Sequence, residues 1–162
     1  MDARKRLLVV AHAPSPNTVR LRDAVLAGKY TAWRRVCQDL GSDLGRAIRE
    51  AMERAGLEPG QALICPVPTS TRRRLARGVD HTVVLAREVA AATGGRPVAA
   101  LRRRHTPPQT GLSGSARQRN VAGAFVAKPG VCRGLAGRVV VLVDDVRTTG
   151  ATLSAAARTL QR

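Results

Sequence analysis

Residues 140–152 read VVLVDDVRTTGAT, and this stretch decides the fold. Its first four residues are an uninterrupted apolar run, the pattern of a β-strand that is covered on both faces. Asp144 and Asp145 follow directly, at the carboxyl end of the strand, where α/β sheets bind their ligands. The small and hydroxylated turn after them leads into a helical pattern from Ala151, so that backbone N–H groups can converge on a phosphate. The adjacent carboxylates can accept hydrogen bonds from neighbouring sugar hydroxyls.

An acidic pair after an apolar strand also occurs in other classes of protein. A nucleotide-hydrolysing P-loop protein needs a G-x-x-x-x-G-K-[ST] loop, and the sequence has none, since Gly28-Lys29 is followed by Tyr30. A receiver domain normally carries its phosphorylated aspartate early, whereas this pair lies near the end of the sequence. A solvated acidic turn without a ligand does not account for the threonine-rich residues that follow. The pattern therefore favours a sugar–phosphate site.

The rest of the chain alternates strand-like and helix-like segments, which predicts a mainly parallel sheet in one α/β domain, residues 1–162. From Thr31 to Ala55, apolar residues recur every three or four positions, which predicts helix with one buried face. Gly41 and Gly45 weaken its middle, so the segment forms either one helix or two. Residues 102–120 lack an apolar pattern and are predicted to form a long flexible loop. The other predicted strands are 7–11, 62–65, 98–101, 123–127 and 139–143, and the other predicted helices are 17–27, 83–92 and 151–160.

The net charge of +17 indicates an anionic partner, either a nucleic acid or a polyphosphate metabolite. Only Tyr30, Trp33 and Phe125 are aromatic, too few for a base-stacking surface. Cys37, Cys65 and Cys132 stand far apart, so we expect buried thiols and no metal site.

No apolar run approaches the ~20 residues of a membrane-spanning helix. The basic start and the short apolar run 7–11 do not make a convincing export signal. We therefore expect a cytoplasmic protein with no membrane partner.

The stretch 140–152 is similar to the phosphoribosyl pyrophosphate motif of type I phosphoribosyltransferases. This resemblance implies their three-layer α/β fold with a mainly parallel sheet. It also implies that Asp144 and Asp145 are the catalytic pair, which contacts the ribose hydroxyls. The residues assigned to the 5-phosphate turn are Arg147, Thr148, Thr149, Gly150, Ala151 and Thr152.

Two further segments narrow the resemblance to the ComF family, over roughly residues 18–160. Cys65-Pro66-Val67-Pro68 followed by Arg72-Arg73-Arg74 resembles the family's pattern after its first sheet strand, where the fold holds pyrophosphate. Residues 104–125 resemble the family's flexible-loop signature. The substrate-binding candidates from these segments are Pro66, Val67, Pro68, Thr69, Ser70, Arg72, Arg104 and Arg117.

The sequence departs from the family in four places. It lacks the cysteine-rich zinc segment of many members, so no protein-bound metal is carried over, and it reads Arg77-Gly78-Val79-Asp80-His81 where Arg-Gly-Phe-Asn-Gln is usual. Thr148 stands where purine-salvage relatives have an acidic residue that exchanges a proton with the base. The usual C-terminal strand is also missing after residue 160, so we expect the fold to lack it.

The resemblance implies a protein that binds phosphoribosyl pyrophosphate, with Mg²⁺ carried by that substrate. An active enzyme would transfer the phosphoribosyl group to a nitrogen nucleophile and release pyrophosphate. Two alternatives are a competence-associated DNA-uptake factor that binds single-stranded DNA, and a non-catalytic metabolite sensor. A homodimer is a possible assembly.

Overall fold

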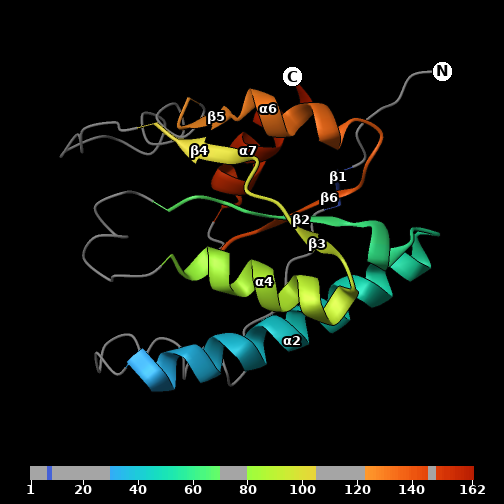
Figure 1. Ribbon diagram of the computed structural model, residues 1–162, viewed down its shortest axis with the longest axis vertical. Coiled ribbons are helices and arrows are strands. Elements are labelled where there is room, and N and C mark those ends of the chain that lie inside the picture. Colours follow the sequence, from blue (N-terminus) through green and yellow to red (C-terminus); the bar gives the residue numbers. More distant parts are fainter. Residues whose placement is uncertain (1–6, 9–29, 70–79, 105–122, 146–148) are drawn as a thin grey trace.

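The computed structural model describes residues 7–8, 30–69, 80–104, 123–145 and 149–162. Within this part of the chain, four strands form a parallel sheet in the order β1-β6-β2-β3. Helices α2 and α4 lie on one face of the sheet, and the β4–β5 hairpin, α6 and α7 lie on the other (Figure 1). An α/β architecture with a parallel sheet, predicted from the sequence, is therefore confirmed. The sheet strands are β1 (Leu7–Leu8), β2 (Leu63–Pro66), β3 (Arg96–Pro97) and β6 (Val140–Val143).

Strands β2 and β6 form the centre of the sheet. Their register runs from Leu63 opposite Val140 to Pro66 opposite Val143, and every residue of both strands is buried. The Val67 N–H donates to the Val143 carbonyl oxygen at 2.8 Å and extends the pairing by one residue. The uninterrupted apolar run of β6 therefore reflects a strand covered on both faces.

Helix α2 (Tyr30–Arg54) confirms the helix predicted for 31–55, and of the two alternatives it is the single continuous helix. Gly41 and Gly45 are buried where α2 packs against α4 (His81–Thr93). A Cβ atom added at Gly45 would lie 2.5 Å from the Cβ of Ala92. The two glycines therefore serve close helix packing and do not end the helix.

The predicted strand 98–101 is displaced in the structure. Strand β3 comes earlier, because the Arg96 N–H donates to Ala62 at 2.9 Å and the Val98 N–H donates to Ile64 at 2.8 Å. Strand β4 (Leu101–Arg103) leaves the parallel sheet and pairs antiparallel with β5 (Phe125–Ala127). Arg103 therefore belongs to a regular hairpin, and the predicted loop 102–120 began too early.

The remaining elements are short, apart from the last helix. They are η1 (Pro59–Gln61), α6 (Pro129–Cys132), η2 (Arg133–Leu135) and α7 (Ala151–Gln161). Helix α7 follows the predicted bounds 151–160 closely, as α4 follows 83–92, β2 follows 62–65 and β6 follows 139–143. The predicted helix 17–27 lies outside the described residues, as do residues 9–11 of the first predicted strand.

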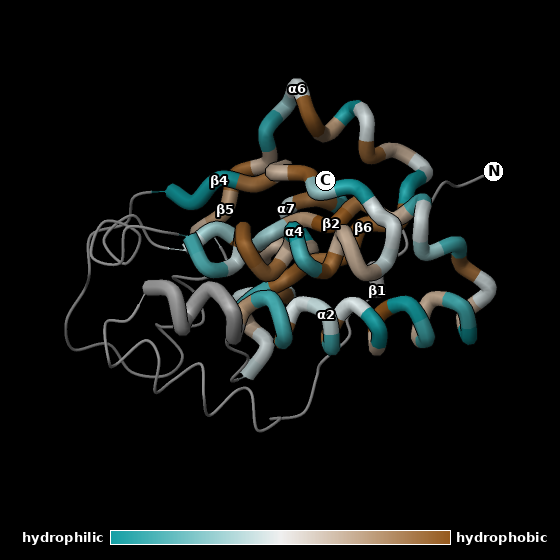
Figure 2. The backbone as a smooth tube through the Cα atoms, turned by 60° about the horizontal axis from the view of Figure 1, so that its bottom comes forward, coloured by the Kyte–Doolittle hydropathy of each residue, from teal (hydrophilic) through white to brown (hydrophobic). Residues whose placement is uncertain are grey.

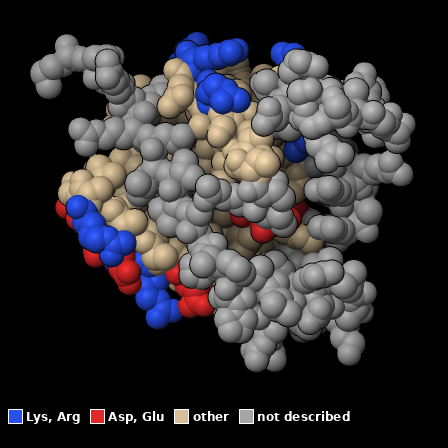
Figure 3. Space-filling view, turned by 180° about the vertical axis from the view of Figure 1, so that it is seen from behind, with Lys and Arg blue, Asp and Glu red and all other residues tan. Residues whose placement is uncertain are grey.

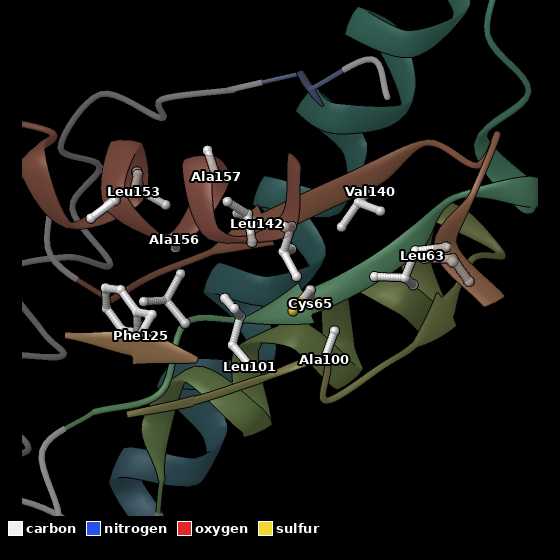
Figure 4. Close-up of a cluster of buried hydrophobic side chains, with 14 of the residues drawn as sticks. Leu63, Cys65, Ala100, Leu101, Phe125, Val140, Leu142, Leu153, Ala156 and Ala157 are labelled. Atoms are coloured by element: carbon white, nitrogen blue, oxygen red, sulfur yellow. The ribbon is translucent and has the colours of Figure 1, made fainter. Parts of the chain in front are cut away.

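Two apolar clusters hold the layers together, one on each face of the sheet. Because side chains alternate along a strand, Val140 and Leu142 pack under α7 and the hairpin, while Val141 and Val143 pack under α2 and α4. Figure 4 shows the first cluster, in which Leu101 and Phe125 of the hairpin lie near Leu142. In Figure 2 the most hydrophobic segments likewise run through the middle layer.

The three cysteines are free thiols. Cys37 and Cys65 are buried as predicted, whereas Cys132 on α6 is only half-buried. Cys132 is less buried than predicted, because it packs against the first cluster and is not enclosed by it.

The exposed side of α2 carries charges of both signs, and ion pairs join Arg46 to Asp43 at 2.7 Å and Arg54 to Glu50 at 3.8 Å. Figure 3 shows such mixed charge at its lower left. In the described segments, no helix combines the length and apolar character needed to cross a membrane.

Candidate functional site

Asp144 and Asp145 lie directly after β6, at the carboxyl edge of the sheet. Strands β2 and β6 end at this edge, and helices α4 and α7 begin there, on the left of Figure 1. Both carboxylates are half-buried, and the Asp145 N–H donates to Asp144 Oδ1 at 3.0 Å. The doublet is therefore neither sealed in the core nor fully solvated, as a ligand-binding pair requires.

The two carboxylates act on opposite layers of the molecule. The charge of Asp145 raises the pKa of Cys37, a thiol of α2 that burial has already shifted most. Asp144 instead interacts with Arg103 of β4. This division continues the alternation of β6, in which Leu142 faces the hairpin and Val143 faces α2.

Burial raises the pKa of Asp144 to about 7, and the negative charge and hydrogen bonding of Asp145 act in the same direction. The backbone N–H of Asp145 and the positive charge of Arg103 oppose the shift. At about pH 7 the Asp144 carboxyl is therefore only partly ionised.

Helix α7 begins directly after this turn. Gly150 precedes it with φ +76°, a left-handed conformation that side chains disfavour, and its carbonyl oxygen accepts from Ser154 N–H at 2.9 Å. The Ala151 N–H lies 3.4 Å from Thr149 Oγ1. A helix leaves its first N–H groups without intrahelical acceptors, and such groups can bind an anion. At the start of α7, Thr149 Oγ1 serves as the acceptor for the Ala151 N–H.

The segment after β2 lies next to the doublet, because Val67 is bonded to Val143. The buried Thr82 hydroxyl donates to the Val67 carbonyl oxygen at 2.8 Å and lies 2.8 Å from Asp80 Oδ1. These bonds tie the start of α4 to the segment that the sequence assigns to pyrophosphate. The sequence analysis did not predict these hydrogen bonds. The signal that could have indicated them is the pair of polar residues Asp80 and Thr82 at the start of a helix.

The predicted site residues divide into four groups. Asp144 and Asp145 directly follow β6, and the segment after β2, with Pro66, Val67, Pro68 and Thr69, lies next to this end of β6. Thr149 and Gly150 precede α7, and Ala151 and Thr152 are its first residues. Arg104 is exposed on the hairpin, where its N–H donates to Ala124 at 2.8 Å. The assignments of Ser70, Arg72, Arg117, Arg147 and Thr148 lie outside the described residues.

The donor set at the doublet is two carboxylates, hard oxygen ligands of the kind magnesium accepts. Over the described ranges, no three His, Cys, Asp or Glu side chains gather to hold an ion. These two oxygen donors fit an ion that a polyphosphate ligand carries better than an ion that the protein encloses.

Comparison of the chain with protein-family models, with curated proteins and with solved structures gave no match.

Proposed function

We propose that this protein has the type I phosphoribosyltransferase fold and binds phosphoribosyl pyrophosphate at the carboxyl edge of its sheet. One observation carries the proposal: an acidic doublet, a left-handed glycine and a helix N-terminus follow β6 in close succession, beside the segment after β2. A ribose 5-phosphate needs acceptors for two hydroxyls and donors for a phosphate, and this succession supplies both within one turn.

Each end of the ligand has its own group of residues in this proposal. Asp144 and Asp145 accept hydrogen bonds from the two ribose hydroxyls, and the amides from Thr149 to Thr152 receive the 5-phosphate. The pyrophosphate lies along Pro66–Thr69, where the Thr82 bond fixes the backbone. Magnesium carried on the pyrophosphate oxygens would neutralise part of the leaving-group charge.

The proposed reaction is a substitution at the anomeric carbon. The bond from this carbon to the pyrophosphate oxygen breaks and its electron pair leaves with pyrophosphate. The lone pair of a nitrogen nucleophile forms the new bond, and the nitrogen then gives a proton to solvent. Positive charge grows on the ribose ring during this step, and the neighbouring carboxylates of the doublet stabilise it.

Asp145→Asn tests the site. We expect isothermal titration calorimetry to detect binding of phosphoribosyl pyrophosphate with Mg²⁺ to the wild type, and clearly weaker binding to the variant. Loss of a charged hydrogen-bond acceptor typically costs about 1.5–3 kcal/mol, which is roughly a 10- to 100-fold loss of affinity. Glu53→Gln, exposed near the far end of α2, removes the same charge and is expected to bind like the wild type.

Unchanged affinity of Asp145→Asn would contradict the proposed role of the doublet. Release of pyrophosphate in the presence of ammonia, the simplest nitrogen nucleophile, supplied as a buffered ammonium salt, would separate an enzyme from a sensor that binds without turnover. The DNA-handling alternative predicts that binding of a single-stranded oligonucleotide survives Asp145→Asn.

A further inference from the structure

Val67, the residue directly after β2, is held from two sides. Its N–H donates to the Val143 carbonyl oxygen at 2.8 Å, at the end of β6. Its own carbonyl oxygen accepts a hydrogen bond at 2.8 Å from the hydroxyl of Thr82, which lies in the first turn of α4. Val67 is 1% exposed and Thr82 is 0% exposed, so this bond is shielded from water. Loss of the hydroxyl would therefore leave a buried carbonyl oxygen without its donor.

Pro66 and Pro68 flank Val67 and make the backbone around it stiff. The ring of Pro68 fixes φ of that residue at about −65°, and it also restricts the residue before it, Val67, to extended backbone. Pro68 has no N–H, so the next backbone donor after Val67 belongs to Thr69, which is half-buried. The position of Val67 therefore determines where the Thr69 N–H lies.

A second acceptor lies close to the Thr82 hydroxyl. Asp80 Oδ1, at the residue before α4, is 2.8 Å from Thr82 Oγ1, the same distance as the Val67 carbonyl oxygen. A hydroxyl has one proton to donate, and a carboxylate accepts hydrogen bonds without donating any. Asp80 and Val67 therefore compete for one proton. The substitution Asp80→Asn would relieve this competition, because an amide N–H can donate to Thr82 Oγ1.

We propose that Thr82 is a positioning residue of the site: by holding Val67, its hydroxyl fixes the place from which the Thr69 N–H donates to a pyrophosphate group. Asp80 weakens this hold, because it draws the hydroxyl proton away from Val67. Thr82 thus acts on the pyrophosphate end of the site and not on the ribose end after β6. The role of Thr69 rests on the proposed phosphoribosyl pyrophosphate site, whereas the hold of Thr82 on Val67 does not.

The hold on Val67 can be measured without a ligand. Amide hydrogen exchange, followed by NMR, reports how often the Val67 N–H separates from Val143. The amide of Leu63, which donates to Val139 at 2.9 Å at the other end of β2, is the internal reference, since a loss of global stability changes both rates alike. We expect Thr82→Val to raise the Val67 rate relative to Leu63, and Thr82→Ser, which keeps the hydroxyl, to raise it less. An unchanged ratio in Thr82→Val would overturn the proposal.

Two further variants separate this hold from a general effect of substitution in α4. Thr93→Val removes a hydroxyl at the other end of the helix, where Thr93 is 1% exposed and donates to the Val89 carbonyl oxygen at 2.8 Å. It is expected to leave the exchange ratio unchanged, and a change equal to that of Thr82→Val would refute the proposal. Asp80→Asn is expected to lower the ratio, because the hydroxyl proton then goes to Val67. An unchanged or raised ratio would contradict the competition.

Ligand binding supplies the second measurement. Calorimetric affinities are compared for phosphoribosyl pyrophosphate with Mg²⁺ and for ribose 5-phosphate, which lacks the pyrophosphate group. Thr82→Val is expected to lose roughly 2- to 10-fold in affinity for the first ligand, the equivalent of one net hydrogen bond, and to bind the second like the wild type. Thr82→Ser should recover most of the loss. Unchanged affinity for phosphoribosyl pyrophosphate, or an equal loss for both ligands, would refute the positioning role. If the wild type binds neither ligand, the proposed function fails, and hydrogen exchange alone decides whether Thr82 holds Val67.

Discussion

The carboxyl of Asp144 lies at the border between solvent and the core, and its ionisation is linked to the stability of the protein. Burial raises its pKa from the ordinary value of 3.8 to about 7. The folded protein therefore binds this proton more tightly than the unfolded chain does. The resulting stability is fully present below about pH 4 and is lost as the pH rises through about 7.

Asp144→Asn removes this dependence, because an amide has no proton to lose over that range. We expect the free energy of unfolding of the variant, relative to the wild type, to increase between about pH 4 and about pH 8, as measured by urea unfolding. Asp39→Asn, an exposed substitution on α2, is the matched control. A difference between Asp144→Asn and wild type that stays constant with pH would contradict the assignment.

At the scale of elements, the contact between α2 and α4 depends on glycine. Gly41 and Gly45 lie one helical turn apart, and the space beyond them is filled by Glu88 and Ala92 of α4. Sequence propensity alone counts glycine as a helix breaker. In this packed pair of helices the same residues allow the backbones to approach, and tertiary contact outweighs propensity.

Gly45→Ala is therefore expected to destabilise the protein. The added Cβ would lie 2.5 Å from the Ala92 Cβ, and overpacking typically costs about 1–3 kcal/mol, against a gain of up to ~1 kcal/mol in helix propensity. Thermal unfolding should show a lower midpoint for Gly45→Ala and partial recovery when Ala92→Gly is added. Gly130→Ala, with no atom within 4 Å of the new Cβ, is the control and should not destabilise.

The elements that the sequence predicts well are those whose local pattern agrees with their environment. Strand β6 is buried on both faces and reads as four apolar residues, and α7 begins after a glycine. The edge elements were misplaced because pairing partners, not hydrophobicity, decide them: Arg96 is exposed and yet starts β3 through its bond to Ala62. The pairing of Arg103 with Phe125 joins distant residues, so periodicity could not reveal the hairpin.

For the whole molecule, the net charge of +17 is the dominant property. A charge of this size attracts any polyanion over long distances, and salt screens that attraction, with a Debye length of about 8 Å at physiological ionic strength. The doublet is an acidic point on this basic protein. Under the proposed function, the doublet favours a ligand whose hydroxyls can donate hydrogen bonds over a ligand that has phosphates alone.

Salt should therefore separate the two kinds of binding. We expect the affinity for a single-stranded oligonucleotide to fall steeply as salt rises, with a slope of about −0.7 per phosphate contact, as for other single strands. The affinity for phosphoribosyl pyrophosphate should fall less and should remain sensitive to Asp145→Asn. Fluorescence anisotropy of the oligonucleotide and calorimetry over one salt series check this, and parallel slopes would contradict it.

Cys37 of α2 is 0% exposed, and burial raises the pKa of its thiol to about 12, with the charges of Asp145 and Glu88 adding to the shift. The thiolate is the form that attacks an alkylating reagent, so this sulfur stays inert while the helices are packed on the sheet. It reacts only when that edge opens. The rate at which Cys37 is modified thus measures how often this edge of the molecule opens.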